Sequence, residues 1–303
     1  MANLTVFQQE IFGKLPEIQK KFNEPMAKHT SFRIGGPAEV MLFPKNTEEL
    51  AQILKVSAIM DCKTAILGAG TNILAPDDGI SGLVICLKDA MDGMELLPGD
   101  RIRVAAGVTM ARCAVFAAKH SLQGMEFAHG IPGTVGGGVY MNAGAYGGEM
   151  CQIVESVDVM SPEGTVKTLS CEEMDFSYRH SRLEEERGIV VSAVLHLAPG
   201  EESTIREKMQ DLMNRRRTSQ PLDLPSAGSA FKRPVSGYAA ALIDQAGLKG
   251  FRIGDAAVSE KHAGFVVNLG NATAAQVREL LDRVSGLVAE ASGIRLEPEV
   301  RIW

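Results

Sequence analysis

Glycine-rich segments are the first features of this sequence whose residue types and spacing suggest chemistry. The stretch GIPGTVGGGVYMNAGAYGG, residues 130–148, contains eight glycines in nineteen residues. Each glycine destabilises a regular helix or strand by roughly 0.5–1 kcal/mol relative to alanine, so this density needs a reason. Apolar residues separate the glycines, which disfavours a flexible Gly/Ser linker. The stretch therefore predicts a loop that a ligand approaches closely.

A second glycine loop, ILGAGTNIL at residues 66–74, follows a short predicted strand. A Rossmann fingerprint would need a third glycine at position 73 and then a helix, whereas Ile73 stands there and Pro76 follows. The longer stretch is not a P-loop either, because Val139 occupies the position of the lysine. Both loops can still point backbone N–H groups at an anion. Together they predict a long diphosphate ligand that lies across both.

The composition restricts the class of partner. The net charge of −6 argues against nucleic acid or an acidic membrane surface as the main partner. No apolar run approaches the roughly 18 residues of a membrane span, and no signal-peptide pattern opens the chain. The five cysteines show no CxxC spacing and the six histidines no HExxH pattern, so neither a metal site nor a disulfide framework is expected. We expect a cytoplasmic protein, whose oligomeric state the sequence does not reveal.

The hydrophobic pattern predicts an α+β protein with boundaries near residues 80 and 200. Helices are expected at residues 3–22, interrupted at Pro16, and at 46–60, 109–120, 200–217, 237–247 and 273–293. Strands are expected at residues 38–43, 64–67, 82–87, 101–106, 155–160, 165–170, 188–197, 252–258, 264–270 and 294–303. In the second helix, Asn46 is expected to cap the N-terminus and Glu49 to complete a capping box. Its predicted buried face comprises Leu50, Ile53, Leu54, Ser57 and Ala58.

Six motifs, in this order, carry a resemblance to a known family. They are FRIGGPA (32–38), LGAGTNIL (67–74), GIPGTVGGGVYMNAGAYG (130–147), YRHS (178–181), SAGSAFKRP (226–234) and EPEVRIW (297–303). The chain thus resembles UDP-N-acetylenolpyruvoylglucosamine reductases, flavoenzymes of peptidoglycan precursor synthesis, from about residue 30 to its end. The resemblance implies an FAD-binding fold of the vanillyl-alcohol oxidase type in two subdomains, 1–80 and 81–199. A C-terminal α+β substrate domain, 200–303, would return its last strand to the active site.

The resemblance also implies non-covalently bound FAD, with NADPH as co-substrate. Side chains would block the approach of main chain to the pyrophosphate and the ring, which explains the glycines. The implied cofactor-binding residues are Arg33, Leu67, Gly68, Ala69, Gly70, Thr71, Asn72, Ile73, Leu74, Gly133, Thr134, Gly136, Gly137, Asn142, Ala143, Gly144 and Arg301. From residue type alone, the two arginines are equally well read as surface ion-pair residues. His129 is expected to carry no covalent flavin.

The implied reaction adds hydride and a proton across an enol ether. NADPH would reduce the flavin, and the terminal carbon of the enolpyruvyl group would then take hydride from flavin N5. Negative charge develops on the adjacent carbon and carboxylate, so a cation or acid and a proton donor are needed. The resemblance implies Arg179 for the carboxylate, Ser229 as proton donor and Glu299 to polarise the developing enolate.

Other roles for these three residues stay open at the level of sequence. Arg179 also fits an ordinary sheet-edge arginine, and Ser229 a turn serine beside glycine. Glu299 also fits an ion pair with Arg301, two residues on along the same strand face, and Glu297 on that face competes for its role.

The substrate, UDP-N-acetylglucosamine enolpyruvate, also carries a diphosphate. The implied substrate-binding residues are Tyr146, Lys232, Arg233, Lys261 and His262. The alternatives are a solvated basic patch for the four cationic types and a core position for the tyrosine. Only residues 182–187 separate two motifs where one branch of the family carries an extra tyrosine loop. The chain therefore resembles the shorter, second type, and the residue that gates its site is left open.

Two rival functions remain. An FAD oxidase of the vanillyl-alcohol type would share the fold but use another substrate. A sugar-nucleotide-binding module without catalysis would belong to another class. The joint presence of Arg179, Ser229 and Glu299 in matching motifs disfavours that module.

Overall fold

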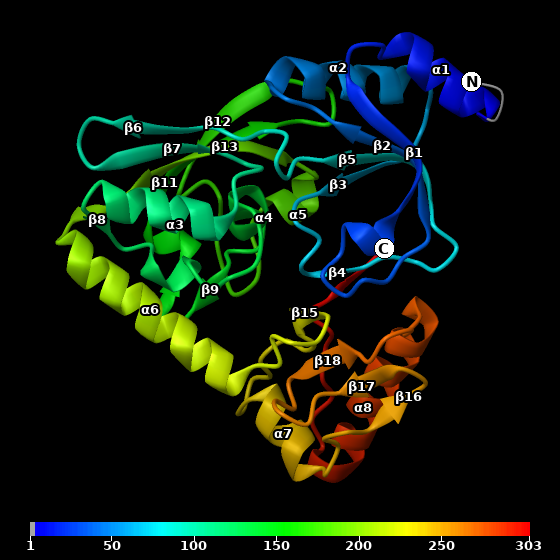
Figure 1. Ribbon diagram of the computed structural model, residues 1–303, viewed down its shortest axis with the longest axis vertical. Coiled ribbons are helices and arrows are strands. Elements are labelled where there is room, and N and C mark those ends of the chain that lie inside the picture. Colours follow the sequence, from blue (N-terminus) through cyan, green and yellow to red (C-terminus); the bar gives the residue numbers. More distant parts are fainter. Residues whose placement is uncertain (1–3) are drawn as a thin grey trace. The chain divides into compact units, whose positions relative to one another are not determined.

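The computed structural model describes residues 4–303 and divides into two compact units (Figure 1). Unit 1 contains residues 4–22, Glu39–Ala69 and Ser81–Asn214. Unit 2 contains Asn23–Ala38, Gly70–Ile80 and Arg215–Trp303. Each unit has its own buried apolar cluster, so each is described by itself.

The first sheet runs in the order β1-β2-β5-β3. Its strands are β1 (Gln19–Pro25), β2 (Pro37–Phe43), β3 (Thr64–Leu67) and β5 (Ile80–Cys86), and β3 runs parallel to β5. Helices α1 (Val6–Lys14) and α2 (Thr47–Ile59) cover one face of it (Figure 1). The strands predicted at 38–43, 64–67 and 82–87 are confirmed.

The helix predicted at 3–22 is wrong beyond Lys14, and residue 3 lies outside the described residues. Pro16 explains the end of the helix, because proline lacks an N–H and disfavours helical backbone in the residue before it. The chain then enters β1 instead of resuming a helix.

Helix α2 confirms most of its predicted features. The Asn46 side chain accepts a hydrogen bond from the Glu49 N–H at 2.8 Å. The predicted capping box is wrong, because the Glu49 carboxylate accepts instead from the Lys45 N–H at 2.8 Å. Ala58 is exposed, contrary to prediction. At 100° per residue it lies about 90° from the centre of the buried stripe, which explains the exposure.

The second sheet of unit 1 is antiparallel, in the order β12-β11-β13-β7-β6. Its strands are β6 (Met94–Leu97), β7 (Arg101–Ala105), β11 (Val154–Met160), β12 (Val166–Ser170) and β13 (Ile189–His196). All but β6 were predicted, and β6 contains no buried residue. The central strand β13 is almost wholly buried, and α3 (Met110–Lys119) adds apolar residues to the same core.

Part of the long glycine stretch is a helix, which corrects the expectation of a continuous loop. Helix α4 spans Val135–Tyr140, and the Thr134 hydroxyl caps it by accepting from the Gly137 N–H at 3.3 Å. A Cβ on Gly136 would lie 2.7 Å from the Cβ of Ala106. A Cβ on Gly138 would lie 2.8 Å from the sulfur of Met110. These two glycines therefore permit close packing inside unit 1.

Unit 2 is built on a sheet in the order β15-β18-β17-β16. Its elements are β15 (Ser226–Ser229), α7 (Ala239–Gln245), β16 (Arg252–Ile253), β17 (Ala256–Val258), β18 (Phe265–Asn268) and α8 (Ala274–Ser292). Helix α8 supplies much of the core of this unit. The strand predicted at 252–258 is instead a hairpin, because Gly254 adopts a φ of +56° between β16 and β17.

The end of the chain returns along unit 2. Strand β19 (Arg301–Ile302) pairs in parallel with β4 (Ile73–Leu74). The strand predicted at 294–303 is otherwise reduced to an isolated bridge between Phe231 and Pro298. Pro298 lacks the N–H that a continuous ladder needs, which explains the break.

The remaining elements are short, apart from one long helix. They are η1 (Met26–Lys28), β8 (Leu122–Gln123), η2 (Glu126–Ala128), β9 (Gly144–Ala145), β10 (Gly148–Glu149), η3 (Met150–Gln152), α5 (Leu183–Glu186), β14 (Ala198–Pro199) and the long helix α6 (Glu202–Ser219). Across residues 4–303, no helix combines the length and apolar character that crossing a bilayer requires. Nor do three His, Cys, Asp or Glu side chains in that range gather as metal ligands.

Candidate active site

The short glycine loop, residues 66–74, leaves β3 and enters β4. Gly70 has a φ of +63°, and a Cβ there would collide with the carbonyl oxygen of His29. Position 70 therefore requires glycine on two grounds, conformation and space. Leu67 and Leu74 at the two ends are fully buried, so they offer a ligand only their main chain.

Unpaired main-chain donors mark this loop as an anion site. Within residues 4–303, the backbone N–H groups of Gly68, Ala69, Gly70 and Asn72 have no acceptor. Buried or half-buried N–H groups are almost always paired, so these four are suited to an external acceptor. Consecutive N–H groups in a turn form a concavity for phosphate. The loop therefore fits the pyrophosphate of a dinucleotide such as FAD.

The same loop is anchored to the last strand of unit 2. The Asn72 carbonyl accepts a hydrogen bond from the Arg301 N–H at 2.9 Å. The Asn72 amide donates to the Glu299 carbonyl at 3.2 Å. Ile73, next along the loop, pairs with Arg301 in the parallel bridge. The part of the loop in unit 2, residues 70–74, thus lies next to the segment 299–302, which contains Glu299.

The second glycine segment meets the first inside unit 1. A Cβ on Gly68 would lie 2.6 Å from the Thr134 hydroxyl, so the two segments touch at these residues. In residues 4–303, the N–H groups of Gly133 and Thr134 have no acceptor. The N–H of Gly136 is different, because it donates to the Ala106 carbonyl at 2.9 Å. The donors open to a ligand are thus at the entry to α4, not along it.

Asn142 is buried and its side chain is engaged by the protein. Its amide nitrogen donates to the Glu149 carboxylate and to the Ser177 carbonyl, both at 3.1 Å. Its carbonyl oxygen accepts from the Cys151 N–H at 3.0 Å. The neighbouring Ala143 donates its N–H to Gly138 at 2.8 Å. These contacts hold the end of the glycine segment against the turn that contains Arg179.

Arg179 lies in a tight turn rather than at a sheet edge. The turn is closed by reciprocal hydrogen bonds of 3.2 Å between Ser177 and His180. Arg179 has a φ of +55°, a left-handed conformation that is costly for a residue other than glycine and often found at functional sites. Its guanidinium donates to the Gly144 carbonyl at 3.3 Å and stacks 5.0 Å from the Tyr178 ring. A half-buried cation is thus presented beside the end of the glycine segment.

In unit 2, a bulged strand presents Ser229. Ser226 pairs with Val267 and Ser229 with Phe265, with a register shift between the two pairs. Gly228 has a φ of +77° within this bulge. A bulge re-aims a side chain, and the Ser229 side chain is exposed.

Ser229 and Glu299 are brought together by backbone pairing. The Glu299 N–H donates to the Ala230 carbonyl at 2.9 Å, and the Lys232 N–H donates to the Glu297 carbonyl at 2.9 Å. Residues 230–232 therefore lie antiparallel to 297–299. Arg179 belongs to unit 1 and is not part of this arrangement.

The two candidate glutamates differ in surroundings. Glu297 has a side chain 75% exposed and pairs with Lys232 at 3.5 Å, as surface ion pairs do. Glu299 is half-buried and its backbone contacts both Ala230 and Asn72. The geometry therefore favours Glu299 over Glu297 for chemistry beside the loop.

The predicted substrate-binding residues of unit 2 have mixed surroundings. The Arg233 guanidinium lies 4.7 Å from the Tyr238 ring centroid. The Lys261 ammonium donates to the Arg217 carbonyl at 2.6 Å. His262 Nδ1 accepts from the Gly264 N–H at 3.1 Å, and burial lowers the pKa of His262. The lowered pKa favours the neutral form of the His262 imidazole at neutral pH.

Tyr146 and Arg33 are exposed and lie in left-handed turns. Tyr146 has a φ of +54° between β9 and β10, and its side chain is 46% exposed. The alternative interpretation, that Tyr146 occupies a core position, is therefore wrong. Arg33 has a φ of +57° in the turn closed by a 3.1 Å hydrogen bond from its N–H to the Thr30 carbonyl.

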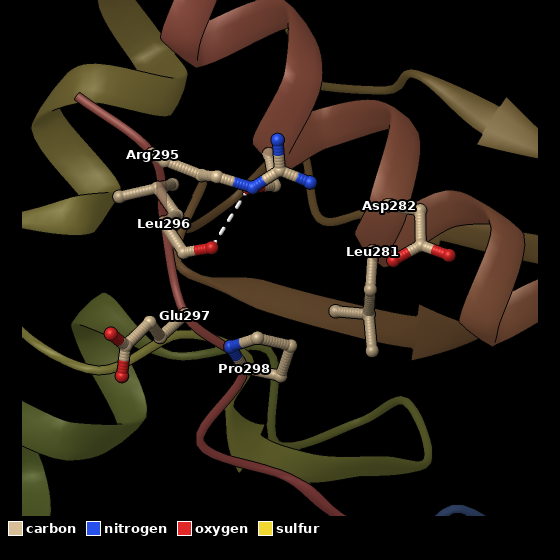
Figure 2. Close-up of a pocket in the computed structure, with 7 residues that line it drawn as sticks. Leu281, Asp282, Arg295, Leu296, Glu297 and Pro298 are labelled. Carbon is tan, nitrogen blue, oxygen red and sulfur yellow. Dashed lines mark hydrogen bonds between the residues drawn. The ribbon is translucent and has the colours of Figure 1, made fainter. Parts of the chain in front are cut away.

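A pocket of about 250 Å³ lies elsewhere in unit 2 (Figure 2). Its lining residues are Leu281, Asp282, Ser285, Arg295, Leu296, Glu297 and Pro298. It contains neither glycine segment and none of the three catalytic candidates. The Ser285 hydroxyl there donates to the Leu296 carbonyl at 2.8 Å, which accounts for that buried serine. The candidate site is therefore defined by the glycine segments, not by this pocket.

Family models match two regions of the chain. A model described as an FAD binding domain matches residues 38–170. A model described as the C-terminal domain of UDP-N-acetylenolpyruvoylglucosamine reductase matches residues 220–303. The two matches confirm the predicted FAD-binding fold followed by a distinct C-terminal region.

Full-length relatives agree with these matches. The UDP-N-acetylenolpyruvoylglucosamine reductase of Syntrophomonas wolfei is 45% identical over 97% of this chain and 98% of its own length. That of Caldanaerobacter subterraneus is 46% identical over 96% of this chain and 97% of its own. The crystal structure of the UDP-N-acetylenolpyruvylglucosamine reductase of Thermus caldophilus superposes with a TM-score of 0.81 at 35% identity. It covers 95% of this chain and 99% of the other.

Proposed function

Since the chain belongs to the UDP-N-acetylenolpyruvoylglucosamine reductase family, we propose that it reduces UDP-N-acetylglucosamine enolpyruvate to UDP-N-acetylmuramate with electrons from NADPH. The observation that carries the proposal lies in unit 2, where hydrogen bonds place Glu299 beside Ala230, the neighbour of Ser229, and beside Asn72 of the short glycine loop. The reaction belongs to peptidoglycan precursor synthesis, and thus to cell-wall biogenesis, cell shape and cell division. We assign it to the cytoplasm.

When bound, FAD would supply the hydride chemistry of the reaction, between NADPH and the substrate. The residues that would hold it are those of the short glycine loop, Gly133, Thr134 and the segment 142–144. The N–H groups of Gly68, Ala69, Gly70, Asn72, Gly133 and Thr134 are suited to pyrophosphate, and glycine at positions 68 and 70 lets the loop pack closely against Thr134 and His29. Arg301, in the strand paired with the loop, is suited to offset phosphate charge.

Arg179 binds the carboxylate of the enolpyruvyl group. A guanidinium meets a carboxylate with two parallel N–H donors, which fixes its orientation as well as its charge. The left-handed turn and the stacking on Tyr178 restrict the rotamers of the guanidinium, so little conformational entropy is lost on binding. The carboxylate then lies where negative charge increases during reduction.

Ser229 gives its hydroxyl proton to the carbon next to the carboxylate. The exposure of Ser229 and the bulge in its strand support this role, because a bulge can re-aim a side chain. Glu299, in its acid form, donates a hydrogen bond to the oxygen on which charge develops. Its pairing with Ala230 keeps it next to Ser229 throughout.

The diphosphate of the substrate is assigned to Lys232, Arg233, Lys261 and His262, with Tyr146 contributing from the glycine segment. Lysine and arginine supply charge, and His262 a neutral donor. We keep the division into FAD-binding subdomains 1–80 and 81–199 and a substrate domain 200–303 as part of this proposal.

Anaerobic titration of the purified protein tests the proposal. NADPH should bleach the flavin absorbance, and the enolpyruvyl sugar nucleotide should restore it without oxygen. Restoration by oxygen alone would favour an oxidase. A colourless protein that still binds the nucleotide would favour a binding module without catalysis.

A further inference from the structure

We propose that Ser31 is a positioning residue that holds the strand of the proton donor at a fixed place beside the flavin loop. The inference rests on the proposed function. The Ser31 hydroxyl donates to the Ser226 carbonyl at 2.6 Å, and the Ser31 N–H donates to the Gly70 carbonyl at 3.0 Å. One residue therefore bonds both to the short glycine loop and to the first residue of β15, which ends at Ser229.

The hydroxyl and the N–H have separate tasks. A serine hydroxyl has one proton to donate. Its 2.6 Å contact with Ser226 is far shorter than its 3.4 Å contact with the Gly70 carbonyl, so the proton goes to Ser226. The Gly70 carbonyl still accepts the hydrogen bond from the Ser31 N–H when the hydroxyl is removed. Removing the hydroxyl therefore loosens β15 and leaves the glycine loop attached.

Strand β15 needs an anchor at Ser226. The strand has four residues and a register shift inside it, so only its ends are in register with β18. Gly228 in the bulge is conformationally permissive. The pairing of Ser229 with Phe265 holds one end of the strand, and the Ser31 hydroxyl holds the other end, Ser226, from outside the sheet.

The segment around Ser31 is itself firmly held. Phe32 and Ile34 are buried, and the Asn268 amide donates to the Phe32 carbonyl at 3.0 Å. The Thr30 hydroxyl donates to the Ile34 carbonyl at 2.9 Å. Ser31 is therefore a rigid link and transmits the position of the loop to β15.

The test compares the two half-reactions of the FAD-loaded Ser31→Ala variant in anaerobic stopped flow. We expect NADPH to bleach the flavin at a rate within about twofold of wild type. Reoxidation by UDP-N-acetylglucosamine enolpyruvate should be slower by about tenfold or more, since small misplacements of a reacting group are costly. The dissociation constant of FAD, from quenching of flavin fluorescence, should stay within about threefold because the Ser31 N–H remains.

Two variants serve as controls. Ser31→Thr keeps the hydroxyl and should restore most of the reoxidation rate. Ser292→Ala removes a hydroxyl that donates to the Val288 carbonyl at 2.7 Å in the last turn of α8, and should change neither half-reaction. If Ser31→Ala does not fold, Ser31→Cys, which keeps a side chain of similar shape with a weak donor, carries the same expectations.

Equal rates in Ser31→Ala and wild type, or equal slowing of both half-reactions, would overturn the inference and leave the proposed function standing. Slow reoxidation that Ser31→Thr fails to restore would overturn it as well. A wild-type protein whose reduced flavin the nucleotide does not reoxidise would instead overturn the proposed function.

Discussion

Replacing Gly70 by alanine tests whether the short glycine loop is built around bare main chain. Gly70 has a φ of +63°, and a Cβ would collide with the His29 carbonyl oxygen. Gly293 is a matched control, because its φ is +73° and nothing lies within 4 Å of its Cβ position. Both variants incur the left-handed penalty of about 1–2 kcal/mol for a residue with a Cβ.

Only Gly70→Ala also forces the backbone apart. Overpacking typically costs about 1–3 kcal/mol, so the unfolding free energy should fall by about 2–5 kcal/mol in total. Gly293→Ala should lose only about 1–2 kcal/mol. Each charge-assisted hydrogen bond to phosphate is worth about 1.5–3 kcal/mol. If displacement of the loop breaks one such hydrogen bond, the affinity for FAD should fall by about tenfold or more. We expect this loss in Gly70→Ala and not in Gly293→Ala.

The assay uses the single tryptophan of the chain. Trp303 lies in unit 2 with both glycines, and its backbone N–H donates to the Leu74 carbonyl at 3.1 Å. Urea unfolding followed by its fluorescence reports the stability of this unit, and flavin fluorescence gives the affinity for FAD. Equal destabilisation of the two variants, or unchanged FAD affinity in Gly70→Ala, would refute the reasoning.

Three further predictions concern the reaction and its pH dependence. Ser229→Ala should leave bleaching by NADPH intact but slow anaerobic reoxidation by about 10²–10⁴-fold, and wild-type reoxidation would remove Ser229 as donor. Glu299→Gln should slow reoxidation by about 10²–10³-fold. Glu297→Gln loses only an exposed ion pair, so its reoxidation rate should stay within about threefold of wild type. A larger loss in Glu297→Gln than in Glu299→Gln would exchange the roles of the two glutamates. Burial lowers the pKa of His262 below its ordinary 6.5, so the unfolded state binds the proton more readily and stability should fall as pH drops through about 6.5. Urea unfolding followed by Trp303 fluorescence gives the free energy of unfolding at each pH. In His262→Phe this free energy should depend less steeply on pH near 6.5, and an unchanged dependence would contradict the lowered pKa of His262.

Local signals predicted the elements that depend on local chemistry. The pattern of α2 was readable because Asn46 and the apolar spacing act within one helix. Strand β1 was missed because Gln19–Pro25 alternates only between exposed and half-buried positions. Helix α4 was missed because glycine disfavours helix, whereas contact with Ala106 requires glycine at Gly136. Tertiary packing reversed the local preference there.

The candidate site shows the same division. The glycine loops were recognisable because positive φ and close approach leave a mark in residue type. No such signal marks Ser31 in the sequence, since a serine beside FRIGGPA resembles any turn serine. Its role depends on the hydrogen bond to Ser226, 195 positions away in the chain. The choice between Glu297 and Glu299 likewise needed burial and pairing, because the sequence predicts both on the same face of one strand.

The central claim is that main-chain donors without a protein acceptor in the described residues bind the pyrophosphate of FAD. Amide hydrogen exchange, read by mass spectrometry with and without FAD, tests it most directly. We expect strong added protection in peptides that cover residues 66–74 and 130–134. Protection confined to other segments, with these two exchanging as fast in the presence of FAD as in its absence, would contradict it.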